Sequence, residues 1–350
     1  MAFLVFCCLR SITCLRTNFR NCSITNKTLF LVLDGILSLA YNYIKQIIRY
    51  LTLCSGDRKL QKDIRHGIFL AVLAAALYAL SSPLSKILLG YMPSTLMAGF
   101  LYVGAGVGMV IVAMLRKASG SKDAEMCLTR QELPFTVAMV VLDIAAPICL
   151  LLGLKMTTAA SVSLLNNFEI VATALIAMFV FKESISPRLW LGILFVTASC
   201  ALLSLEDVSS LRFNSGALLV LLACICWGFE NNCTRKLSSK DPLQIVMIKG
   251  IFSGAGSIII GLVIGERIEY LWTVPAVLLL GFVAYGLSIY FYVYAQRFLG
   301  AARTSAYYAV APFIGVFLSL VIFREIPGGL FAVALALMAV GAWLSSRDEY

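Results

Sequence analysis

Charged residues are scarce in this 350-residue chain, at 13% of positions, which is about half the share usual in a soluble domain. Histidine is scarcer still, with His66 alone, and no two of the eleven cysteines are spaced as CxxC. A zinc site therefore lacks its usual ligands. No GxxxxGK[ST] loop, nucleophile elbow or HExxH motif occurs. We therefore expect no enzyme, no cofactor and no bound metal.

Apolar residues are abundant instead, at 61% of the chain, with a mean hydropathy of +0.92. They form ten stretches, each long enough to cross a hydrocarbon core of about 30 Å as a helix. The predicted spans are 66–90, 95–115, 133–154, 159–181, 188–205, 215–237, 243–264, 274–297, 302–323 and 328–346. The fold class predicted is an all-α polytopic membrane protein with ten transmembrane helices.

The formal net charge of +10 comes from short basic clusters between the spans, not from one basic face, so we expect no nucleic-acid partner. If the first span starts in the cytoplasm, sixteen Lys and Arg residues lie on the inner side and five on the outer side. The outer five are Lys86, Lys155, Arg212, Arg267 and Arg324. This bias predicts that both ends of the ten-helix core are cytoplasmic.

The two halves of the chain resemble each other. A shift of 149 residues aligns, without a gap, Gly67 with Gly216, Tyr78 with Trp227, Lys86 with Arg235 and Pro93 with Pro242. A shift of 142 residues aligns Ala159, Ala160, Ser163, Phe181 and Glu183 with Ala301, Ala302, Ser305, Phe323 and Glu325. Because each half has an odd number of spans, the halves are expected to cross the membrane in opposite directions, as in many secondary transporters.

Short motifs at matching places link the chain to a known family. They are Phe181-Lys182-Glu183 and Phe323-Arg324-Glu325 at helix ends, Trp227-Gly228, the small-residue starts Ala159-Ala160 and Ala301-Ala302, and Pro312. With these motifs the chain resembles the EamA-type transporters of the drug/metabolite transporter superfamily, from about residue 65 to 347. The resemblance implies two five-helix repeats, 65–206 and 207–350, around a central substrate cavity, and solute movement driven by a gradient. We expect the protein in a bacterial-type plasma (inner) membrane.

Two features depart from the family pattern. Where the ninth span has Pro312, the fourth has Ile170, directly after Glu169. Residues 1–64 form a leader outside the repeats, which we expect to be poorly ordered. Its apolar tract is interrupted by Asp34, so we expect residues 1–56 to be dispensable.

Three acidic residues are predicted near the middle of their spans: Asp143, Glu169 and Glu230. A charge there costs on the order of 2.5–3.5 kcal/mol on insertion scales, so each acid needs a partner, a proton or water. Asn166 and Asn167 precede Glu169, and a spacing of three places Asn166 on the same helix face. This patch lines a cavity or bonds helices together.

The sixth span carries Trp227, Glu230 and Asn231 within five residues. An indole and a carboxylate three residues apart suit an amine, although Glu230 is equally suited to pairing with a basic residue. Lys249 in the seventh span is a candidate partner for one of the acids, and Tyr308 lines the ninth-span side or simply packs. Glycine pairs spaced four apart, at 104 and 108 and at 250 and 254, predict close helix contact.

These features together predict a secondary active transporter of a small organic metabolite, such as an amino acid, an amine or a related solute. Proton coupling or exchange is expected, with Glu169 titrating during the cycle and Glu230 contacting the substrate. The expected partners are the solute, the lipid bilayer and, as one option, a second copy in a homodimer. The rival hypothesis is a non-transporting scaffold or a subunit of a larger membrane complex.

Overall fold

The computed structural model describes residues 58–118, 128–182, 186–207, 212–237, 240–299, 304, 307–324 and 328–345. Within these ranges, eight helices are long and apolar enough to cross a membrane, and two shorter apolar helices follow, Ala311–Phe323 and Gly329–Ser345. The protein is an integral membrane protein, and its spans are helical as predicted. Most of the predicted leader and part of the predicted ninth span lie outside the described residues.

The first half consists of eight helical elements. They are α3 (Arg58–Ala79), α4 (Ser81–Leu88), α5 (Ser94–Ala118), the 3-10 turn η3 (Arg130–Glu132), α6 (Leu133–Met156), α7 (Ala159–Leu165), α8 (Phe168–Phe181) and α9 (Pro187–Ser204). A short antiparallel ladder of β1 (Leu205–Asp207) and β2 (Arg212–Phe213) lies in the connection to the second half.

The second half begins with the longest uninterrupted helix of that half. Its elements are α10 (Ser215–Leu237), α11 (Pro242–Ile248), η4 (Lys249–Ser253), α12 (Gly254–Val263), α13 (Thr273–Gly281), η5 (Phe282–Leu287), α14 (Ser288–Leu299), α16 (Ala311–Phe323) and α17 (Gly329–Ser345). Both η4 and η5 are π-helical turns within longer helices, a local geometry that is frequent at functional sites.

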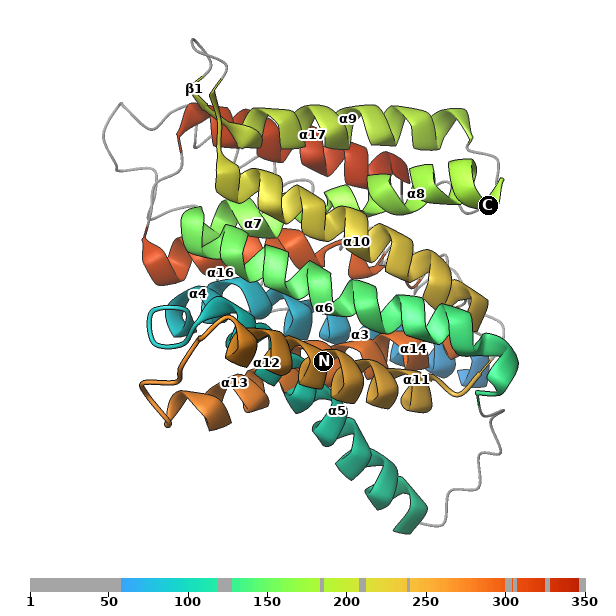
Figure 1. Cartoon of the computed structure of the whole chain (residues 1–350). Coiled ribbons are helices and arrows are strands. Elements are labelled where there is room, and N and C mark those ends of the chain that lie inside the picture. Colours follow the sequence, from blue (N-terminus) through green and yellow to red (C-terminus); the bar gives the residue numbers. More distant parts are fainter. Residues whose placement is uncertain are drawn as a thin grey trace.

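Helices at corresponding places in the two halves make corresponding contacts. α10 packs against α6 and α8, whereas its counterpart α3 packs against α14 and α16. α9 lies beside its own counterpart α17 along one edge of the bundle (Figure 1). A further parallel is in the backbone: Lys182 after α8 and Arg324 after α16 are the two non-glycine residues with positive φ in the described part of the chain.

Some predicted spans contain a local break. The predicted span over 159–181 is found at Ala159–Val180, and its helix is interrupted once. α7 ends at Leu165 and α8 begins at Phe168. The Asn167 side-chain amide donates to the carbonyl oxygen of Leu164 (3.2 Å), a local bond of the kind by which asparagine competes with helical pairing. The Glu169 amide still bonds the Asn166 carbonyl (3.1 Å), an i to i+3 turn that keeps both residues on one side.

Glycines allow α5 to approach two neighbouring helices closely. A Cβ atom on Gly104 would lie 2.1 Å from the carbonyl oxygen of Leu278 in α13. One on Gly250 would lie 2.4 Å from the backbone nitrogen of Gly106, and one on Gly254 would lie 2.6 Å from the backbone nitrogen of Val103. The prediction of close helix contact at these glycines is confirmed.

Gly104→Val is expected to destabilise the protein, because the added atoms collide with the α13 backbone and the two helices must separate. Overpacking of this kind costs about 1–3 kcal/mol. Gly328→Ala is the matched control, since a Cβ atom there meets nothing within 4 Å. The midpoint of thermal unfolding should fall for the first variant only, and equal midpoints would contradict the packing described.

Cysteine labelling checks the predicted orientation. Single cysteines placed at Lys122 and Lys240, in a chain with its native cysteines replaced, should react with a membrane-impermeant reagent only from the cytoplasmic side. Cysteines at Arg212 and Arg267 should react only from the outside. Labelling of positions 122 and 212 from the same side would contradict the ten-helix topology.

Candidate functional site

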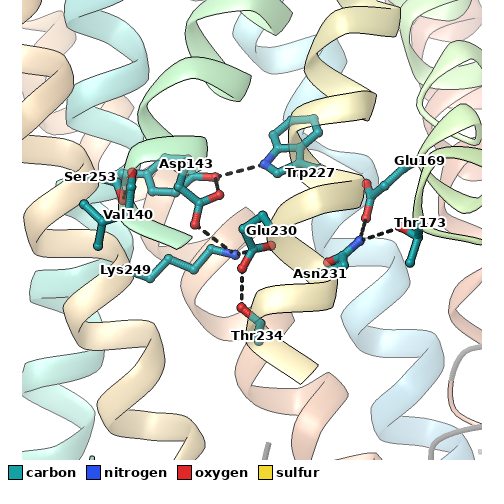
Figure 2. Close-up of polar contacts among 11 residues, drawn as sticks. Val140, Asp143, Glu169, Thr173, Trp227, Glu230, Asn231, Thr234, Lys249 and Ser253 are labelled. Atoms are coloured by element: carbon teal, nitrogen blue, oxygen red, sulfur yellow. Dashed lines mark hydrogen bonds and ion pairs between the residues drawn. The ribbon is translucent and has the colours of Figure 1, made fainter. Parts of the chain in front are cut away.

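Three charged side chains from three helical elements meet inside the bundle. Lys249 Nζ lies 3.1 Å from Asp143 Oδ2 and 3.1 Å from Glu230 Oε2. Asp143 is fully buried and Glu230 is 2% exposed. Asp143 comes from α6, Glu230 from α10 and Lys249 from the start of η4, so this ion triad joins the two halves (Figure 2). Lys249 neutralises a buried acid, as hypothesised, and it contacts two.

The remaining carboxylate oxygens of the ion triad are also bonded. The Tyr102 hydroxyl donates to Asp143 Oδ1 (3.0 Å) and accepts a bond from Trp227 Nε1 (3.4 Å). The Thr234 hydroxyl donates to Glu230 Oε1. All four carboxylate oxygens therefore have a protein partner, and the ion triad is a closed network.

Glu169 lies in the first turn of α8 and is half-buried. The side-chain amide of Asn231 donates to Glu169 Oε1 (2.6 Å) and to the Thr173 hydroxyl (3.2 Å). Among the described residues, no lysine or arginine forms an ion pair with Glu169, and its Oε2 atom has no hydrogen-bond partner. This carboxylate is therefore held in place by a neutral amide alone.

Helix α10 separates the two polar groups. Glu230 and Asn231 are consecutive, so their side chains leave the helix about 100° apart. Figure 2 shows Glu230 directed toward Lys249 and Asp143, and Asn231 directed toward Glu169 and Thr173. Adjacent residues of α10 thus belong to two separate groups: Glu230 pairs with Lys249, which also binds Asp143 in α6, and Asn231 binds α8 directly.

Tyrosines surround this region from several helices. The ring of Tyr78 in α3 meets that of Tyr285 in η5 edge-on (centroids 5.9 Å apart, 79°) and lies 5.9 Å from that of Tyr308. The Tyr285 hydroxyl accepts a bond from Ser81 (2.9 Å), and the Tyr308 hydroxyl lies 3.3 Å from the Ser288 hydroxyl. Glu169 is near enough for its charge to act on the hydroxyls of both Tyr78 and Tyr308.

The structure brings most of the predicted site residues into these two groups, and it shows others that the sequence did not single out. Asn166 and Asn167 form the break before α8, and the buried side-chain oxygen of Asn166 has no hydrogen-bond partner. Tyr102 and Tyr285 were missed, because an aromatic residue in an apolar span looks like ordinary packing. Tyr285 lies in a π turn, which leaves no sequence signal.

No three His, Cys, Asp or Glu side chains in the described part of the chain are placed to share a metal ion. The chemistry of the two groups is that of charge pairing and hydrogen bonding. They join helices of both halves inside the bundle.

Comparison with known proteins identifies the family. The model of the EamA-like transporter family matches residues 65–205 and again residues 214–347. The chain belongs to this family. Two successive matches cover most of the described residues, and the resemblance inferred from the helix-end motifs is confirmed.

Similar proteins are spread across distant organisms. The chain is 26% identical to an uncharacterized transporter of Methanothermobacter thermautotrophicus over 275 residues, covering 74% of this chain and 80% of that protein. It is 20% identical over 246 residues to the uncharacterized transporter YyaM of Bacillus subtilis, covering 67% and 79%. Solute carrier family 35 member F6 of Mus musculus matches over 153 residues at 26% identity, covering 39% and 41%.

A solved crystal structure shares the fold with a TM-score of 0.57 at 18% identity, covering 83% of this chain and 98% of that one. At this identity the likeness concerns the fold alone. The family and its relatives support a membrane transporter, and the substrate is argued from the site below.

Lys249→Met should strongly destabilise the protein, because two buried carboxylates lose their counter-ion. Breaking a buried ion pair by removing one partner costs about 3–5 kcal/mol. Adding Asp143→Asn and Glu230→Gln to Lys249→Met should recover most of the loss. Lys240→Met is the matched control: it breaks a 3.1 Å pair with Glu132 at the ends of the spans, where water reaches both groups, and should cost less. An unfolding midpoint for Lys249→Met as high as that of Lys240→Met, or one that the two added substitutions do not raise, would contradict this account.

Proposed function

We propose that this protein is a secondary active transporter of a small organic solute, such as an amino acid, an amine or a related metabolite. The observation that supports this most is the pair of polar groups at the contact between the halves. Asp143 and Glu169 belong to the first half, and their respective partners Lys249 and Asn231 belong to the second, as does Glu230, which also pairs with Lys249. Buried charges of this kind inside membrane spans mark substrate and ion pathways.

The proposed mechanism is alternating access by two inverted five-helix repeats. Three features support it. Each half has an odd number of predicted spans, and α10 packs against α6 and α8 as α3 packs against α14 and α16. The residues that follow α8 and α16, Lys182 and Arg324, both have a positive φ. In repeats of this type the substrate site lies at the repeat interface near the midplane. Rocking of one half against the other would break and remake the contacts of α10 with α6 and α8.

Coupling to protons is part of the proposal. Among the described residues the two groups hold three carboxylates and one lysine, which leaves two negative charges uncompensated, so protons or cationic solutes are needed to offset them. Carboxylates in this setting act as proton relays in many membrane transporters. A plasma membrane location with both ends of the helical core in the cytoplasm accords with the basic residues counted above.

Purified protein in sealed vesicles tests the function. A solute from a panel of amino acids, amines and related metabolites should accumulate when a pH gradient is imposed without ATP. Amines also cross lipid in their neutral form, so protein-free vesicles are measured in parallel and their uptake is subtracted.

Glu169→Gln should abolish the part of the accumulation driven by the pH gradient, because the glutamine cannot titrate. Glu132→Gln, the same change near the end of a span, should leave accumulation unchanged. Absence of flux for every solute would favour the scaffold hypothesis, and a covalently altered solute would indicate an enzyme. An unchanged pH profile in Glu169→Gln would move the coupling role to Glu230 or Asp143.

A further inference from the structure

The two polar groups beside α10 differ in one decisive respect. In the ion triad every carboxylate oxygen has a partner, and Lys249 supplies a full positive charge. Glu169 has one neutral donor, Asn231, and one oxygen without a partner among the described residues. Among the described residues, the ion triad therefore has no carboxylate oxygen left without a partner, whereas Glu169 has one such oxygen and no cationic partner.

Asn231 cannot supply that charge. Its amide is fixed between Glu169 and Thr173, so it orients Glu169 Oε1 without neutralising it. A membrane-buried carboxylate without a counter-charge is costly. Glu169 as a whole is half-buried, and its Oε2 atom is not among the fully buried atoms that lack a partner.

The surroundings of Glu169 favour an organic cation. The rings of Tyr78 from α3 and Tyr308 before α16 contact each other. Both side chains lie within electrostatic range of the Glu169 carboxylate. Tyrosine faces attract ammonium groups by cation–π contact. The other titratable groups within electrostatic range of Glu169 are Cys224 on α10 and, on the far side of that helix, Glu230 and Lys249. An anionic solute would meet no free positive group in this part of the described structure.

We propose that Glu169, together with Tyr78 and Tyr308, binds the ammonium group of a cationic substrate. This deepens the proposed transport function and rests on it. The sequence alone suggested Glu230 as the amine contact, but Lys249 already occupies that position. Glu230 is therefore a positioning residue of the ion triad, and the substrate class narrows from small organic solutes to organic monocations with a protonated amine.

Ligand stabilisation of the purified protein tests this without requiring transport. The probes are primary monoamines from methylamine to 2-phenylethylamine, each compared with the alcohol of the same carbon skeleton. At a pH where the amines are protonated, at least one amine should raise the unfolding midpoint in a concentration-dependent way, and its matched alcohol should not.

Variants then locate the site. Glu169→Gln should weaken binding of that amine about tenfold to a hundredfold, because a charge-assisted contact is lost. Tyr308→Leu should weaken it about threefold to tenfold, and Tyr308→Phe, which keeps the ring, should bind nearly as the parent does. Glu132→Gln is the matched control for loss of one carboxylate and should bind as the parent does.

The outcomes separate the two proposals. Alcohols that stabilise as well as amines, or no stabilisation by any amine, would overturn the ammonium site. Loss of pH-driven flux in Glu169→Gln with amine binding retained would also overturn it, while leaving the transport function in place. If Glu169→Gln does not fold, the amine–alcohol comparison and the two Tyr308 variants still decide the question.

Discussion

The interior of this protein depends on the position of one lysine. Lys249 contacts both Asp143 and Glu230 in the interior of a largely apolar bundle, and it is the residue that makes two buried carboxylates tolerable there. Because its partners lie on helices of opposite halves, the same contact that offsets charge also fixes how the halves meet. A π turn beginning at Lys249 places its ammonium between them.

Helix α10 connects this network to the rest of the site. Of two adjacent residues on it, Glu230 pairs with Lys249 in the ion triad and Asn231 bonds Glu169 in α8, so a movement of α10 affects both groups. In the described part of the chain positive charge is unevenly placed: Lys249 contacts both carboxylates on one side of α10, and no cationic side chain pairs with Glu169 on the other side. Coupling between solute and proton follows from that imbalance under the proposed function.

Hydropathy was sufficient to locate the helices, because a lipid-facing span must be long, apolar and fully hydrogen-bonded within itself. Depth along each span was also sufficient to select Asp143, Glu169 and Glu230. The sequence could not assign Lys249 to its partners, since that depends on which helices pack together. Nor could it show the break at Asn166, or that Tyr102 completes the ion triad, because local polar bonds and aromatic packing leave no periodic signal.

Infrared difference spectroscopy of the purified protein tests the central claim most directly, namely that Glu169 is the one carboxylate left for an external cation. Binding of an amine should change the infrared absorption of a single carboxyl group. This change should disappear in Glu169→Gln and persist in Glu132→Gln. The absorption of Asp143 and Glu230 should not change, because both carboxylates already pair with Lys249. A carboxyl signal of unchanged size in Glu169→Gln would contradict the account and assign the cation to Asp143 or Glu230.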